Sequence, residues 1–158
     1  MNGNDDLRAS KESIFHVSAD PERIFPLLCP VRETEWLDGW AYQLVYSESG
    51  VAEAGAVFQT DRVERGKETW VVSRYDPQGF RIEFVVVNPE SHVLKLEISL
   101  EREAADRTRV RWLSTLTALT DRGRELVRSY RDGRQASAID HLAAALEHFC
   151  VTGRMLKL

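Results

Sequence analysis

The stretch from Cys29 to Trp40 holds the side chains whose types and spacing could do chemistry in this sequence. A proline at its second position and a glycine near its end are typical of the start and the end of a short helix. On such a helix Arg32 and Trp36 lie four residues apart, so they can stack in a cation–π contact. We therefore expect a cavity rim, where Trp36 and Trp40 contact a ligand and Arg32 or a glutamate fixes its polar end.

A second interpretation of this stretch needs no ligand. The same helix packs Trp36 and Leu37 on a sheet and leaves its charges in water, because aromatic side chains are core residues first. Glu33 and Glu35 lie on different sides of the helix and make a poor acid/base pair. The helix dipole can activate the Cys29 thiol, but no histidine is near it in sequence, which favours a buried and inert thiol.

Residues on predicted strands supply the rest of the candidate binding site. Trp70 and Arg74 share a strand face, and Arg74 either holds a ligand carboxylate or pairs with a surface acid. His92 is the first residue on the apolar face of another strand. It could act as a general base, form a hydrogen bond with a ligand, or be a turn residue whose hydrogen bonds are satisfied within the protein. Aromatic residues with few hydroxyls suit a flat, apolar molecule, although the same side chains could fill the space completely. The predicted ligand-binding residues are Arg32, Trp36, Trp40, Tyr42, Trp70, Phe84, His92, Trp112 and Ser114.

The sequence lacks the spacings that mark metal and cofactor sites. Its two cysteines and four histidines show neither a C-x-x-C nor an H-x-x-x-H pattern. It also has no phosphate-binding loop and no dinucleotide glycine motif. We therefore predict no metal and no cofactor, and the sequence identifies no catalytic residue.

Composition places the chain among globular proteins. With 158 residues, 43% of them hydrophobic, it is expected to fold as one domain over residues 1–158, with residues 1–11 frayed. The net charge of -4 argues against nucleic acid as a partner. The first ten residues are polar, and no apolar run is long enough to span a membrane. We expect a cytoplasmic protein with reduced thiols, as a monomer or a homodimer.

Alternation of apolar and polar residues predicts seven strands. The first covers residues 12–17, and two short helices follow, the first with Asp20 as its N-cap and Pro21 at its first position. Six further strands, joined by short turns, cover residues 41–47, 55–65, 69–75, 80–86, 92–101 and 109–116. Because short turns join consecutive strands, these strands are expected to pair antiparallel.

The one long helical pattern comes last, from Thr120 to Gly153. Its two apolar stripes point in different directions on a continuous helix, and Gly133 lies between them. We predict a short helix, a left-handed break at Gly133, and a long helix from about Arg134 to Cys150. A sheet with one long helix buries the apolar stripe of that helix by curling around it.

This order of elements, β-α-α-β6-α, resembles the α+β helix-grip fold of the START-like superfamily, which includes lipid-transfer domains and polyketide cyclases and dehydratases. The resemblance covers residues 11–150. The stretch at 29–40 is similar to a signature of a subgroup of small bacterial members, as are Ser49-Gly-Val-Ala-Glu53, Arg74-Tyr-Asp-Pro77 and Ile82-Glu-Phe84. The resemblance implies a cavity between a curved, roughly seven-stranded antiparallel sheet and the C-terminal helix, roofed by the two early helices.

Three functions follow as hypotheses. The first is a module that binds a small hydrophobic or aromatic molecule in that cavity. The second is an enzyme of the cyclase or dehydratase type on a polyketide-like substrate, with His92 or a tyrosine as acid/base. The third is a protein-interaction module resembling the chaperone-ATPase activators of the superfamily, which would expose an apolar patch instead of a cavity.

Overall fold

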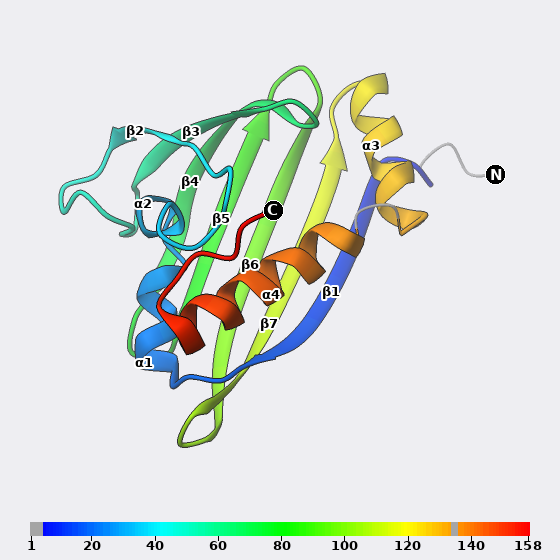
Figure 1. Ribbon diagram of the computed structural model, residues 1–158. Helices are drawn as coiled ribbons and strands as arrows, with labels where there is room; N and C mark the ends of the chain where they lie inside the picture. Colours follow the sequence, from blue (N-terminus) through cyan, green and yellow to red (C-terminus); the bar gives the residue numbers. More distant parts are fainter. Residues whose placement is uncertain (1–4, 134–135) are drawn as a thin grey trace.

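The computed structural model describes residues 5–133 and 136–158, and a seven-stranded antiparallel sheet in the order β1-β7-β6-β5-β4-β3-β2 forms its centre (Figure 1). The strands are β1 (Arg8–Val17), β2 (Gln43–Tyr46), β3 (Val57–Arg62), β4 (Gly66–Asp76), β5 (Arg81–Asn88), β6 (His92–Ala104) and β7 (Arg107–Ala118). Strands β2 to β7 follow one another across the sheet, and β1 pairs with the last of them. The predicted strand number and antiparallel pairing are confirmed.

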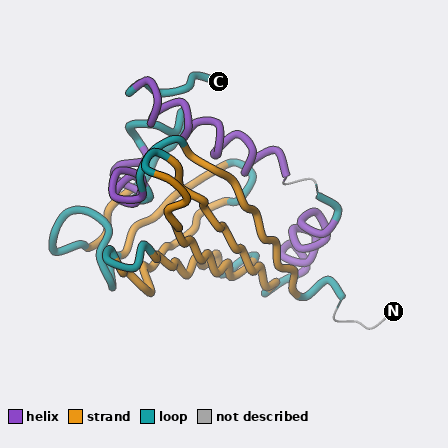
Figure 2. Tube along the Cα trace, turned by 90° about the horizontal axis from the view of Figure 1, so that it is seen from below, coloured by secondary structure: helices purple, strands orange, loops and turns teal. Residues whose placement is uncertain are grey.

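The helices lie on the concave side of this sheet. After β1 come α1 (Pro21–Ile24), the 3₁₀ helix η1 (Phe25–Leu27) and α2 (Pro30–Glu33), and after β7 come α3 (Asp121–Arg131) and α4 (Ala136–Thr152). Figure 2 shows α4 passing over the sheet while the strands bend below it. The predicted helix-grip architecture, a curved sheet wrapped around a C-terminal helix, is therefore confirmed.

Capping and proline placement explain the short early helices. The Asp20 carboxylate accepts a hydrogen bond of 2.8 Å from the Arg23 backbone N–H, as predicted for an N-cap. Pro26 then removes a helical donor, and the chain tightens into η1. The second helix is also shorter than the sequence predicts, because α2 ends at Glu33 and the chain reaches Gly39 through turns.

The beginning of the chain is more ordered than predicted. Strand β1 begins at Arg8, which pairs with Thr117, and Asp6 forms ion pairs with Arg124 and Arg128 of α3. The expectation that fraying extends to residue 11 is therefore wrong for residues 8–11. Backbone hydrogen bonds to β7 hold this polar segment in the sheet, and these bonds do not depend on the hydrophobicity of the side chains.

Gly133 separates the two C-terminal helices as the sequence predicts. It has a φ of +74°, in the left-handed region that favours glycine. The predicted start of the long helix at Arg134 lies outside the described residues, and α4 continues two residues past Cys150, to Thr152. Among the helices of residues 5–133 and 136–158, none has the length and apolar character that a membrane crossing needs.

We predict that Gly133→Ala destabilises the protein by about 1 kcal/mol, because alanine pays a steric cost at positive φ. Within the described residues, a methyl group here would meet no atom within 4 Å, so the loss reflects the backbone alone. Urea unfolding of the variant and the wild type measures this difference. A gain in stability would show that the helix runs through this position.

Gly123→Ala provides the steric comparison. A methyl group at Gly123, in the first turn of α3, would lie 1.9 Å from the Ser91 carbonyl oxygen. This overlap forces the helix away from the sheet, so we expect a loss of about 3 kcal/mol, clearly larger than at Gly133. Equal losses for the two variants would contradict this account of α3 packing.

Candidate functional site

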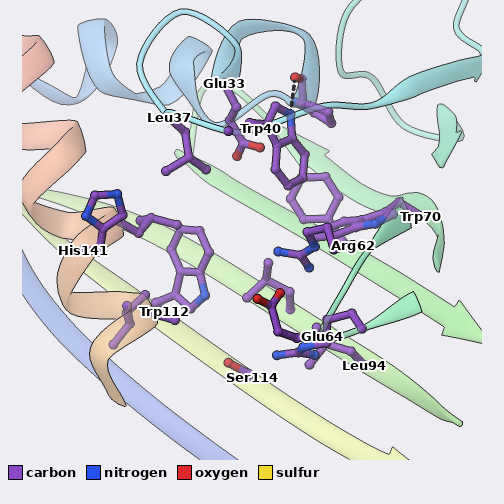
Figure 3. Close-up of a pocket in the computed structure, with 18 of the residues that line it drawn as sticks. Glu33, Leu37, Trp40, Arg62, Glu64, Trp70, Leu94, Trp112, Ser114 and His141 are labelled. Carbon is purple, nitrogen blue, oxygen red and sulfur yellow. Dashed lines mark hydrogen bonds between the residues drawn. The ribbon is translucent and has the colours of Figure 1, made fainter. Parts of the chain in front are cut away.

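A cavity of about 650 Å³ lies between the concave face of the sheet and the helices. Figure 3 shows side chains from the sheet, from α4 and from the segment after α2 pointing into it. The apolar part of its lining comes mainly from strands β3 to β7 and α4: Phe58, Trp70, Phe84, Leu94, Leu96, Ile98, Trp112 and Leu142. The residues of the loop that follows α2, Leu37 to Trp40, roof it, close to the position expected from the sequence.

An interlocked aromatic cluster forms one wall of the cavity. The Trp70 ring stacks on Phe58 with centroids 5.3 Å apart and meets the edges of Phe84 at 5.7 Å and Trp40 at 6.0 Å. Both indole N–H groups are used: Trp70 donates to Thr60 Oγ1 at 2.9 Å and Trp40 to the Pro30 carbonyl at 2.8 Å. These bonds fix the ring orientations, so the wall is preformed.

Arg62 brings a positive charge from the end of β3 to this wall. Its guanidinium carbon lies 5.7 Å from the centroid of the Trp40 ring, a cation–π contact. Its Nη2 donates to Glu68 Oε1 at 3.1 Å. Figure 3 shows the Arg62 side chain directed toward the middle of the cavity.

Glu68 and His92 form a buried polar pair behind Arg62. Both side chains are fully buried, with His92 Nε2 2.7 Å from Glu68 Oε2 and His92 Nδ1 2.8 Å from Ser91 Oγ. Burial alone would raise the pKa of Glu68, but the hydrogen bond from His92 and the charges of Arg65 and Arg62 hold this pKa below its ordinary value. The ionised carboxylate of Glu68, itself bound by His92, therefore holds the Arg62 guanidinium in place.

Glu33 lies at the end of α2, and Figure 3 shows it beside Trp40 at the cavity. Burial raises the pKa of Glu33 from 4.5 to about 8, and the charge of Arg62 opposes this shift only in part. Although Glu33 is half-buried, the space it faces is the cavity, among apolar side chains such as Leu37 (Figure 3). Near neutral pH it is therefore mainly a neutral carboxylic acid, which can donate as well as accept a hydrogen bond.

Five of the nine predicted site residues line the cavity: Trp40, Trp70, Phe84, Trp112 and Ser114. Four positions need correction. Arg32 forms an ion pair with Glu35 at the surface, and Trp36 is fully buried with its Nε1 2.9 Å from the Leu27 carbonyl oxygen. The short α2 helix explains both, because the turns after Glu33 send the two side chains in different directions.

Tyr42 and His92 are the other two corrections. Tyr42 borders a separate small pocket of about 10 Å³ beside β2. Strand β2 begins only at Gln43, so Tyr42 does not belong to the sheet as the sequence predicted. His92 does begin the inward face of β6, but Glu68 occupies its Nε2 and Ser91 its Nδ1. It is therefore an interior residue that reaches the cavity through its partners and not by direct contact.

Sequence reasoning missed several polar lining residues, among them Lys11, Arg62, Arg65 and His141. One signal was available for Arg62, since it continues the alternation of Phe58 and Thr60 on one strand face. Arg74, which was considered instead, pairs with Glu83 at 3.4 Å on the surface. The register of β4 shifts between Val72 and Arg74, and this irregularity turns Arg74 outward.

The raised pKa of Glu33 predicts a pH dependence of stability. Below pH 4.5 both the folded and the unfolded states hold the proton, so there is no effect. Between 4.5 and about 8 only the unfolded state releases it, so rising pH favours unfolding, by at most about 1.4 kcal/mol per pH unit. Glu33→Gln removes this cost, and its stability relative to the wild type should therefore increase as the pH rises.

Chemical unfolding at a series of pH values between about 5 and 8 measures this difference. Glu35→Gln is the matched control, because Glu35 lies two residues away and is exposed in its pair with Arg32. We expect its curve to run parallel to that of the wild type. A parallel curve for Glu33→Gln would mean that Glu33 ionises as an ordinary surface acid.

Comparison with known proteins finds similar folds among solved structures. Neither family models nor curated protein sequences give a match to this chain. Norcoclaurine synthase from Thalictrum flavum in complex with dopamine and hydroxybenzaldehyde matches with a TM-score of 0.68 at 11% identity, over 92% of this chain and 87% of the other. Zhui aromatase/cyclase from Streptomyces sp. R1128 matches with a TM-score of 0.67 at 12% identity, over 94% and 99%.

The protein Ara h 8.0201 also matches, with a TM-score of 0.63 at 14% identity, over 92% of this chain and 99% of that one. At these identities the likeness concerns the fold and not the activity. The element order, the antiparallel sheet and the C-terminal helix are shared throughout. The chain therefore has the helix-grip fold.

Proposed function

We propose that this protein binds a small, largely aromatic molecule in the cavity between the sheet and α4. The observation that carries the proposal is the cavity itself, with a volume of about 650 Å³ and a wall of aromatic rings. Ligand sites of drug-sized molecules have volumes of roughly 300 to 1,000 Å³ and a mainly apolar lining with a few polar groups. The cavity has both properties.

The fixed orientation of the wall supports the same proposal. Trp40 and Trp70 each use their indole N–H inside the protein, so they present no unpaired donor to the cavity. Because the rings are already fixed, a ligand that packs against this wall loses little binding free energy to ordering the site. The norcoclaurine synthase structure, whose ligands dopamine and hydroxybenzaldehyde are aromatic, supports this ligand class by fold likeness.

A specific observation favours a second function, acid–base catalysis. Glu33 has a pKa raised by burial to about 8, close to the pH at which a general acid or base works best, and Arg62 lies near enough to lower it in part. Cyclisations and dehydrations of carbonyl compounds both begin with removal of a proton next to a carbonyl. Glu33 would take that role, in place of His92, whose nitrogens are occupied.

The third hypothesis, a protein-interaction module, requires an exposed apolar patch outside the cavity. Strand β2 exposes Leu44, Val45 and Tyr46 at one edge of the sheet. This strand has four residues, too few for a large apolar patch. The cavity therefore remains the better-supported site.

The binding proposal predicts saturable binding of the neutral dye N-phenyl-1-naphthylamine, with an affinity on the order of micromolar. Trp112→Ala should weaken this binding about tenfold, because a stacking surface in the cavity is lost. Arg109→Ala is the control, since Arg109 pairs with Glu101 on the other face of β7. Dye emission gives the affinity. No saturable binding, or equal losses in both variants, would contradict the proposal.

The catalytic proposal predicts exchange of protons next to the carbonyl of an aryl ketone such as 1-indanone in deuterated buffer. The rate should rise with pH and level off above about 8, as the Glu33 carboxylate forms. Proton NMR follows the exchange, and Glu33→Gln should abolish it while Glu35→Gln leaves it unchanged. Exchange that survives in Glu33→Gln would remove Glu33 from the reaction.

A further inference from the structure

Four nitrogen atoms around the cavity are buried and, within the described part of the chain, have no hydrogen-bond partner: Lys11 Nζ, Arg62 Nε, Arg65 Nη1 and His141 Nε2. All four residues line the cavity. A buried donor without a partner costs on the order of 1–3 kcal/mol, and more when it carries a charge. Three of the four residues are cationic, so the unsatisfied capacity of this cavity is for an anion.

We propose that the ligand carries an anionic group, such as a carboxylate or a sulfonate, which Arg62, Arg65 and Lys11 hold while its rings occupy the aromatic wall. This inference rests on the proposed binding function and names the chemical class of its ligand. Arginine suits the task because its planar guanidinium presents several donors to one carboxylate. Lysine adds a point charge on a flexible stem.

The three cations reach the cavity from two sides. Arg62 ends β3 and Arg65 lies in the turn to β4, where the Arg65 guanidinium carbon is 5.8 Å from the ring centroid of Tyr130 on α3. Lys11 comes from β1, where it pairs in register with Ser114, a residue of the cavity lining. Because Tyr130 belongs to α3, and α3 packs on β1 and β7, Arg65 and Lys11 approach the end of the cavity that faces α3.

Arg62 is held in place for this role. Glu68 Oε1 accepts from its Nη2, and Glu68 is itself bound by His92, so one edge of the guanidinium is fixed. The Nε atom, which lies beside Nη2 on the same edge, stays unpaired within the described residues. A donor that is oriented in advance and left unsatisfied is what a preorganised anion site requires.

The carboxylates of the lining do not cancel these charges. Glu33 is mainly neutral near pH 7, because burial raises its pKa to about 8. Asp38 accepts from the Leu158 backbone N–H at 3.0 Å and lies 3.9 Å from Lys157 Nζ. Asp61 and Glu64 are exposed to water, which screens their charges. Glu68 is the buried acid, and it opposes three cations.

Two dyes with the same rings separate the anion from the apolar part of the ligand. 8-Anilino-1-naphthalenesulfonate is N-phenyl-1-naphthylamine with one added sulfonate. At low ionic strength the wild type should bind the sulfonate at least tenfold more tightly than the neutral dye, and added salt should reduce this ratio. Lys11→Met and Arg65→Met should each reduce this ratio severalfold.

Arg62→Met is expected to have the largest effect on the ratio, but it also leaves the buried Glu68 with one partner fewer. Within the described residues neither Lys11 nor Arg65 forms an ion pair, so their variants keep the test decisive if Arg62→Met does not fold. Arg74→Met is the matched control, because Arg74 is exposed and pairs with Glu83 outside the cavity. Circular dichroism verifies that each variant is folded.

Each outcome of the experiment has a defined meaning. Equal affinity for the two dyes would overturn the anion site and leave the proposed binding function standing. A sulfonate preference that persists in the double variant of Lys11 and Arg65 and is lost in Arg74→Met would place the anion at the surface and overturn the proposal. Binding of neither dye would contradict the binding function itself.

Discussion

The structure depends on one geometric constraint: a straight helix must cover the concave face of a strongly curved sheet. Strands β3 to β7 bend below α4, as Figure 2 shows, so the helix cannot touch all of them along its length. It is fully packed near its C-terminal half, where Ala145 and Leu146 are completely buried. Toward its N-terminal half, where Ala138, Ile139 and His141 face the space, the cavity opens. The ligand site is therefore a consequence of the fold, since filling it would require a bulkier or bent helix.

The buried carboxylate of Glu68 connects this scaffold to the chemistry of the site. A fully buried carboxylate needs partners, and Glu68 finds them in His92 on one side and Arg62 on the other. The result is a chain of contacts from Ser91 to the centre of the cavity. Structural stability and ligand recognition share this chain, because the interactions that satisfy Glu68 also determine where the Arg62 charge is placed. A cation so anchored on aromatic rings favours a ligand that is both flat and acidic.

Alternation along strands identified much of the cavity wall and failed where the backbone left its regular period. Phe84, Trp112 and Ser114 were found because side chains two residues apart share one face of a strand. Arg74 was considered because it shares the period of Trp70, but a register shift in β4 reverses the faces beyond Val72. Arg62 was overlooked although it continues the alternation of Phe58 and Thr60 on β3. Arg32 and Trp36 were assigned to the rim on the assumption of a continuous helix, whereas α2 ends at Glu33. Lys11 was missed because a polar terminal segment was expected to be frayed, and its pairing with β7 is a contact between opposite ends of the chain.

The sequence by itself determined the architecture: the order of elements, the antiparallel sheet, the N-cap at Asp20 and the helix break at Gly133. These features depend on local periodicity and on the conformational preferences of single residues, which are written within a few positions of one another. Only the tertiary structure decided the properties of the site. The raised pKa of Glu33 arises from its burial at the cavity, against the opposing charge of Arg62. The nitrogens of Lys11 and Arg65 are unpaired because no acceptor among the described residues reaches them. Burial and the absence of a partner are properties of the assembled chain, because they depend on every segment that could have come near.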